Sequence, residues 1–533
     1  MEPDGSMRII ESLKFDMPDE RFELLERESG SILHASANGE EFRHERVHGA
    51  ESIGASIDET EQKLRVAFHT AINTDVIFRK FRSGSGCRVL LVYMNGMADD
   101  SIVSRFVIAP LMQSNERFAA DLGGLLSKVI EIAETEVETD LRKVKASVMD
   151  GMTAVFIEGC CASVLVESRG FEKRSVSEAQ NERIVQGPKE SFTEALRTNI
   201  TLLRRIVKTE DMIVEYGKVG CENKTRTALV YRAGFTDETL IFEIKSRLAR
   251  IKNDIAIGIG IIDQLIEDDS IFPIPRTLST ERPDRAASHL MNGSAVLLAE
   301  GSPFALVMPI TLASLMNSPE DVYMRRPVGT LLRAVRYVGA AISVILPGYF
   351  IALTMYHQGL ISTEVLSTII KSREMVFEPL PFEMLLLLFV FQLIREAGMR
   401  VPGSIGQAIG VIGGLILGQA AVAANLASTV ILIVVALSGL GNLCIPDYST
   451  QVGTSYLRIA FVIAAWLGGL LGLATALMLF IAYMANVKSF GVPFLSPFAP
   501  KTFSRRPPFI RGRIGLRSKP ADYNNTAEES ALE

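Results

Sequence analysis

The sequence contains few side chains whose types and spacing would support catalysis. His44, Glu45 and His48 match H-E-x-x-H, a pattern that on a helix places two imidazoles on one face for zinc, beside a general base. Such a helix needs an apolar face anchored in a core and a third ligand, whereas Gly39 and Gly49 bracket this stretch. We therefore interpret the match as accidental, and the sequence predicts no metal site.

No other group of residues predicts an active site. Gly258 and Gly260 lack the third glycine of a dinucleotide fingerprint and do not follow a predicted strand. Ser191 and His289 are conceivable partners, but solvated or capping roles explain them better. The five cysteines are odd in number and suit neither a disulfide framework nor a zinc site. We expect no cofactor, and the chain is not predicted to be an enzyme.

The chemistry that the sequence offers lies in a long uncharged stretch. Residues 401–446 carry no charge, so lipid or buried protein must surround them. Polar side chains inside the stretch still need hydrogen-bond partners; they are Gln407, Gln419, Asn425, Ser428 and Thr429. Interhelical hydrogen bonds are the simpler explanation. The alternative is a water-lined ion path, in which Val434 and Leu437 form apolar rings that gate by dewetting.

Small residues follow a regular spacing in the same stretch. Every fourth residue is a glycine at Gly406, Gly410, Gly414 and Gly418. On a helix these residues share one face and allow a neighbouring backbone to approach closely. We expect this glycine face to pack against another helix of this chain or against the same helix in a second copy.

The second half of the chain has the composition of a transmembrane domain, which we assign to residues 326–490. The apolar runs predict four to six membrane segments at 337–357, 384–394, two within 401–446, and 459–487. Charged residues at the ends of the second run must face protein or water, namely Glu383, Arg395 and Glu396.

Flanking charges predict the orientation of these segments. The first run is preceded by four arginines, Arg325, Arg326, Arg333 and Arg336, and residues 491–533 form a basic tail. The soluble half and the tail are therefore both expected in the cytoplasm. An even number of crossings is then required, whereas the runs count to five. We expect residues 403–425 to be re-entrant, which leaves four crossings. A partly inserted segment at 304–316 is the alternative.

The first half predicts a cytoplasmic α/β region. Residues 1–72 are expected to be a flexible extension, followed by subdomains at 73–186 and 187–325. The elements on which this division depends are strands at 88–94, 153–157, 160–166, 227–231 and 295–298 and helices at 191–206 and 237–251. No secretory signal is recognisable at the start. The net charge of −6 is spread over a large chain and argues neither for nor against a nucleic-acid partner; we expect none.

Several stretches resemble the A subunits of bacterial spore germinant receptors, the GerA family. The resemblance covers roughly residues 85–500 and is carried by 395–402, 405–410, 413–421, 187–199, 280–284, 302–306 and 319–323. The chain departs from the family pattern in its long N-terminal extension and at Asn292, where an acidic residue is expected.

The resemblance implies a nutrient-responsive receptor subunit in the inner membrane of the spore. In this family the A subunit works with a permease-like B subunit, thought to bind the nutrient, and with a lipoprotein C subunit. The A subunit is thought to form a homo-oligomeric cation channel. A secondary transporter is the alternative function, although it would be expected to show internal repeats and more spans.

Overall fold

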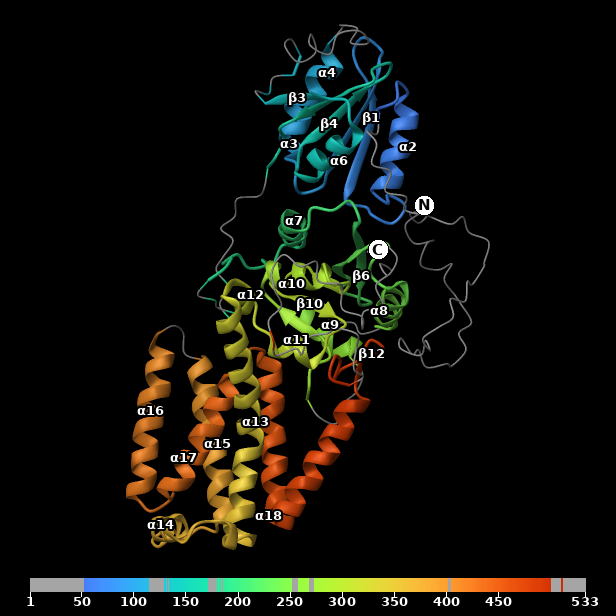
Figure 1. Cartoon of the computed structure of the whole chain (residues 1–533). Coiled ribbons are helices and arrows are strands. Elements are labelled where there is room, and N and C mark those ends of the chain that lie inside the picture. Colours follow the sequence, from blue (N-terminus) through green and yellow to red (C-terminus); the bar gives the residue numbers. More distant parts are fainter. Residues whose placement is uncertain are drawn as a thin grey trace, which may run out of the picture.

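The computed structural model describes residues 52–499 and 510, apart from 115–128, 131, 133, 171–178, 180, 183, 185, 252–256, 268–272 and 401–403. Two sheet units and a helix bundle follow one another along the molecule (Figure 1). The H-E-x-x-H stretch and the basic tail after residue 510 lie outside the described residues.

The first unit is a five-stranded antiparallel sheet in the order β1-β2-β4-β5-β3. Its strands are β1 (Val76–Arg82), β2 (Arg88–Met94), β3 (Thr135–Glu138), β4 (Thr153–Ile157) and β5 (Ser163–Val166). Its helices are α2 (Ile57–Ala67), α3 (Asp100–Ile102), η1 (Val103–Ile108), α4 (Ala109–Gln113) and α6 (Leu141–Met149). Helices α2 and α6 cover one face of the sheet, and the α3–α4 segment covers the other.

The second unit is again a five-stranded antiparallel sheet, in the order β6-β7-β9-β10-β8. Its strands are β6 (Met212–Val219), β7 (Thr225–Arg232), β8 (Leu278–Thr280), β9 (Ala295–Ala299) and β10 (Ala305–Met308). Its helices are α7 (Leu196–Ile206), α8 (Glu238–Arg250), α9 (Ile259–Ile266) and α10 (Pro283–Leu290). Helices α7 and α10 cover one face, and α8 and α9 cover the other.

The two units have the same topology. Each begins with a helix and a strand pair, places its third strand at the far edge, and inserts a helix before its fourth strand. The turns correspond as well, because Gly96 and Gly234 both have positive φ after the second strand. Asp99 and Asp237 then cap the helices that follow. The chain therefore contains an internal structural repeat, which the sequence analysis did not predict.

Helix α7 joins the two units. Its Arg204 pairs with Asp75 of the first unit, Nε to Oδ2 at 3.1 Å, and both side chains are 1% exposed. At the rim, Arg197 pairs with Asp100 at 3.0 Å. The two repeats are therefore docked through a specific charged contact rather than linked only by chain.

The bundle follows the short helices α11 (Leu312–Met316) and α12 (Glu320–Tyr323). It contains α13 (Arg326–Tyr356), η2 (Gln358–Leu360), α14 (Thr363–Arg373), α15 (Leu380–Arg400), α16 (Ser404–Ala423), α17 (Thr429–Leu443) and α18 (Tyr448–Asn486). Helix α14 lies at the end remote from the sheets, and α16 lies at the outer edge (Figure 1). By length and composition, α13 and α18 are each apolar enough to cross a membrane.

Helix α18 is a hairpin of two helical arms. Gly469 has non-helical dihedrals, φ 58° and ψ −140°. The rings of Phe461 and Phe480, on opposite sides of this break, lie 6.2 Å apart, whereas 19 residues of straight helix would span about 28 Å. The turn lies beside Tyr356, at the remote end of α13. The second arm therefore returns the chain to the sheets (Figure 1).

The chain after α18 forms a strap on the second unit. Residues 487–494 include the hairpin of β11 (Lys488–Ser489) and β12 (Val492–Pro493). Phe490 enters the core on one face of the second sheet, and Phe494 enters the core on the other. The Leu312 amide donates to the Phe494 carbonyl at 2.8 Å. The chain thus leaves the second unit to form the bundle and returns to the second unit after α18.

Several predicted elements are confirmed, namely the strands at 88–94, 153–157, 227–231 and 295–298 and the helix at 237–251. Four expectations are corrected. Helix α2 packs against the first sheet, so the extension does not reach residue 72. The strap belongs to the second unit rather than to the tail. Residues 404–423 form one continuous helix, not a re-entrant loop. The last apolar run folds into two arms instead of one span.

Candidate functional site

At the end of the bundle remote from the sheets, a buried carboxylate holds several helices together. Glu383 is fully buried and accepts from Arg373 Nε at 3.1 Å and from the Ser428 amide at 2.5 Å. Ser428 itself caps α17, since its hydroxyl accepts from the Ile431 amide. These contacts tie α14, α15 and the α16–α17 turn together. Glu383 thus faces protein, and Ser428 serves as a helix cap.

The other predicted pore and gate residues do not surround one space within this chain. Val434 is buried in the bundle core, whereas Leu437, one turn later on α17, is 46% exposed. Gln419, Asn425 and Thr429 are exposed. In a single copy, the exposed polar residues and Leu437 face outward, away from the helices that bury Val434.

The glycine face of α16 is similarly unpartnered where the structure describes it. A Cβ on Gly414 would meet no atom within 4 Å, and one on Gly418 would make only ordinary contact with Leu432 at 3.5 Å. The surroundings of Gly406, Gly410 and Gln407 lie outside the described residues. The glycines that do allow close helix packing lie elsewhere: a Cβ on Gly441 would sit 2.4 Å from the Gly339 carbonyl oxygen.

The bundle interior also holds arginines. Arg395, expected to face protein or water, is half-buried, and Glu396 beside it is also half-buried. Arg458, the residue directly before the last predicted run at 459–487, is 2% exposed inside the first arm of α18. Its Nη1 donates to Ser438 Oγ at 3.1 Å. Sequence reasoning missed this residue because the helix continues past it on both sides.

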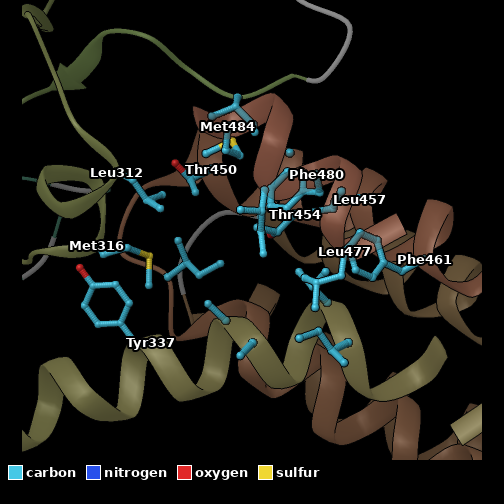
Figure 2. Close-up of a pocket in the computed structure, with 18 of the residues that line it drawn as sticks. Leu312, Met316, Tyr337, Thr450, Thr454, Leu457, Phe461, Leu477, Phe480 and Met484 are labelled. Carbon is cyan, nitrogen blue, oxygen red and sulfur yellow. The ribbon is translucent and has the colours of Figure 1, made fainter. Parts of the chain in front are cut away.

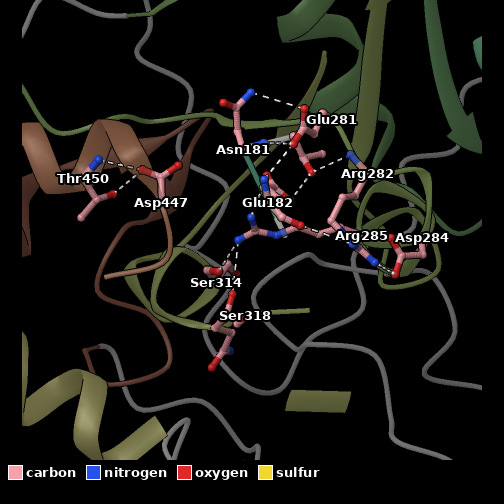
Figure 3. Close-up of polar contacts among 12 residues, drawn as sticks. Asn181, Glu182, Glu281, Arg282, Asp284, Arg285, Ser314, Ser318, Asp447 and Thr450 are labelled. Atoms are coloured by element: carbon pink, nitrogen blue, oxygen red, sulfur yellow. Dashed lines mark hydrogen bonds and ion pairs between the residues drawn. The ribbon is translucent and has the colours of Figure 1, made fainter. Parts of the chain in front are cut away.

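A buried polar cluster connects the two repeats to the bundle (Figure 3). Glu281 accepts from the backbone amides of Asn181 and Glu182 in the linker between the repeats, at 2.5 and 2.7 Å. Arg282, fully buried, donates to the Pro188 carbonyl at 2.9 Å and to Asp284 at 2.7 Å. Residues 280–284, one of the stretches that carry the family resemblance, therefore hold the linker in place.

The same cluster reaches the helices that enter the bundle. Asp284 accepts from the Tyr323 hydroxyl of α12 at 3.0 Å. Asp321 of α12 is fully buried and pairs with Arg333 and Arg336 of α13, at 2.9 and 2.7 Å. Helix α12 therefore joins two sets of polar contacts, since Tyr323 binds the cluster at the inter-repeat linker and Asp321 binds α13. The sequence signal was present, since residues 319–323 also carry the resemblance, but the pairing was not predicted.

An apolar cavity of about 290 Å³ lies where the bundle meets the second unit (Figure 2). It separates α13 from the two arms of α18, and α11 closes one side; its lining includes Met316, Tyr337, Leu457, Phe461, Leu477 and Phe480. The Tyr337 hydroxyl is buried there without a hydrogen-bond partner. The arms of α18 are therefore not tightly packed against α13 at this level.

Three carboxylates interact at this junction. Burial raises the pKa of Asp263 in α9 to about 7, and the negative charges of Glu267 and Asp447 add to the rise. Asp447 caps α18 by accepting from the Thr450 amide at 2.7 Å (Figure 3). The junction between sheet and helices therefore contains a group that titrates near neutral pH.

The chain is similar to known proteins over both sheet units, the polar cluster and the bundle. The family model described as "Bacillus/Clostridium GerA spore germination protein" matches residues 62–520, from within α2 to beyond the strap. The chain belongs to the GerA spore germination family. The match includes both repeats, the polar cluster and the bundle, so the expected family is confirmed and its extent is wider than residues 85–500.

Relatives within the GerA family are similar along most of their length. Spore germination protein KA of Bacillus subtilis (strain 168) is 32% identical over 84% of this chain and 82% of its own. Spore germination protein A1 of the same organism is 33% identical over 86% and 94%. YfkQ, described as an uncharacterized membrane protein of that organism, is 31% identical over 80% and 83%.

One solved structure is also similar. It is the N-terminal domain of the A subunit of the Bacillus megaterium spore germinant receptor GerK3, with 25% identity and a TM-score of 0.37. The alignment covers 49% of this GerA-family chain and 97% of that domain.

Proposed function

We propose that this chain is the A subunit of a nutrient-responsive spore germinant receptor and that copies of it assemble into an ion channel in the spore inner membrane. Family membership supports the receptor role, because relatives that align over most of their length are named spore germination proteins. The name of YfkQ supports a membrane location. The proposed partners are a permease-like B subunit and a lipoprotein C subunit.

The observation that carries the channel proposal is the outer edge of the bundle. Gly414 meets open space on α16, and Gln419, Thr429 and Leu437 are exposed nearby in the chain. Glycine and polar side chains gain nothing from lipid contact, but they suit close packing between helices and a hydrated path. A second copy packed on this edge would provide both a helix that packs closely against the glycines and a hydrated path for the polar side chains.

The proposed topology has six crossings with the sheet units in the cytoplasm. Helices α13, α15, α16 and α17 each contribute one crossing, and the arms of α18 contribute two. The strap supports an even number, because the bundle both leaves and re-enters the second unit. Asp321 neutralises part of the charge on Arg333 and Arg336, so Arg325, Arg326 and the basic tail carry more of the positive-inside signal.

Electrical recording of the purified protein in planar bilayers tests this function. A channel gives currents without a transported solute, whereas a transporter gives solute-dependent flux. Leu437→Ala is expected to raise the current without nutrient by widening an apolar constriction. Val434→Ala is the matched control, because Val434 packs in the core and its truncation should lower protein abundance instead. Solute-dependent flux alone would refute the channel.

A further inference from the structure

Two arginines in the bundle interior have no counter-charge within the part of the chain that the structure describes. Arg395 lies on α15 and Arg458 on the first arm of α18. Among the residues that the structure describes, no carboxylate lies within ion-pair distance of either guanidinium. Helices α15 and α18 contact each other, and the positive charge of Arg395 acts on Arg458.

The hydrogen bonding of both side chains is incomplete. Arg458 is 2% exposed and uses Nη1 on Ser438 Oγ at 3.1 Å, while its Nε is buried without an acceptor. Ser438 Oγ in turn donates to the Ser343 carbonyl at 2.7 Å, so its position is fixed. All three guanidinium nitrogens of Arg395 are inaccessible to solvent and lack acceptors. The Ser343 hydroxyl also has no partner.

Such an arrangement is costly unless an anion completes it. A buried, unpaired ion costs several kcal/mol, and arginine does not relieve this cost by losing its proton. Burying a second arginine nearby adds a similar free-energy cost. The unused N–H groups of Arg395 and Arg458 are donors only, so they require a hydrogen-bond acceptor, and a negative charge on that acceptor would also offset the two cations.

We propose that Arg395 and Arg458 bind a small monovalent inorganic anion of about the size of chloride, beside Ser438 and Ser343. The guanidinium nitrogens that lack acceptors are closed to solvent, which disfavours an anion carrying a chain or a large headgroup. The four residues come from α15, α18, α17 and α13, so the bound anion would join four helices of the bundle. This proposal does not depend on the channel function.

Thermal unfolding of the full chain in detergent tests the site. Sodium chloride, sodium bromide and sodium gluconate are compared at equal ionic strength, since gluconate is too large to enter. We expect the midpoint to rise by several degrees and saturate with chloride or bromide relative to gluconate. The difference should vanish in Arg458→Gln and persist in Lys371→Gln, a control on exposed α14.

Equilibrium dialysis with radioactive chloride provides a second measurement if Arg458→Gln does not fold. The wild type should bind one chloride per chain, and Arg395→Gln should bind at least tenfold more weakly. Identical midpoints of the wild type in chloride and gluconate would overturn the proposal, as expected if a carboxylate from a second copy supplied the charge. Undiminished chloride binding by Arg395→Gln would overturn it too.

Discussion

Among single residues, Asp263 gives the clearest pH dependence. Its pKa is raised from 3.8 to about 7 in the folded chain, mainly by burial. The folded state therefore holds a proton that the unfolded chain releases, and the associated stability is lost as pH rises from about 4 through 7. We expect Asp263→Asn to leave the free energy of unfolding nearly unchanged at pH 4. At pH 8 the substitution should raise the free energy of unfolding by up to about 4 kcal/mol, and the unfolding midpoint should rise with it.

Thermal unfolding of the full chain at the two pH values checks this expectation. Glu222→Gln, in an exposed turn, is the control and should show the wild-type profile. If Asp263→Asn follows the wild type at pH 8, the carboxyl is not a source of neutral-pH instability.

Arg282 is the residue that the polar cluster depends on most. Arg282→Ala removes the counter-charge of Asp284, which keeps only the Tyr323 hydroxyl, and also removes the contact to the Pro188 carbonyl. The expected cost is about 3–5 kcal/mol in the free energy of unfolding, measured by denaturation or by cellular abundance. Arg205→Ala removes an exposed pair with Glu190 and should cost less than about 1 kcal/mol. Equal effects would show that burial of Arg282 is unimportant.

The prediction of these residues from sequence had a clear limit. The types of residue were visible, because Glu383 and Arg395 stood at the ends of an apolar run. Their partners were not, because the Arg373–Glu383 and Arg458–Ser438 contacts depend on how helices pack. Asp263 was not singled out, since nothing local in the sequence indicates its burial or its proximity to Asp447.

At the scale of elements, the structure separates two kinds of glycine. Gly441→Ala would force Cβ against the Gly339 carbonyl oxygen at 2.4 Å, so it should destabilise the bundle and lower abundance. Gly414→Leu projects into open space and should leave the fold of one chain intact while preventing assembly. Size-exclusion chromatography with light scattering and abundance measurements distinguish these outcomes. Full-size complexes of Gly414→Leu would exclude this face as an interface.

Element prediction succeeded where one chemical signal decided the conformation. Buried strands such as β2 and β9 and the apolar helices were predictable from composition. The hairpin of α18 was not, because Gly469 lies inside an uninterrupted apolar run and hydropathy does not report direction. The strap was missed because its few apolar residues, including Phe490 and Phe494, resemble the end of a membrane span.

For the whole molecule, labelling distinguishes six crossings from four. Asn425 lies between α16 and α17 and Gly468 lies at the break in α18, and both turns are at the end of the bundle remote from the sheets (Figure 1). Each is replaced by cysteine in a background without the native cysteines. Both should react with an impermeant thiol reagent added outside intact cells, and Glu222→Cys in the second unit should not. An unreactive Asn425→Cys would refute the six crossings, and labelled Glu222→Cys would reverse the orientation.

The strap has a consequence for biosynthesis. Phe490 and Phe494 complete both faces of the second sheet, yet the ribosome makes them after the entire bundle. At ~5–20 residues per second, the sheet waits roughly ten to forty seconds with part of its core missing. In the proposed topology, a chain whose helices fail to insert would not deliver these two phenylalanines to the sheet. The unfinished domain would then expose apolar surface to cellular proteases, so insertion and survival of the protein are linked.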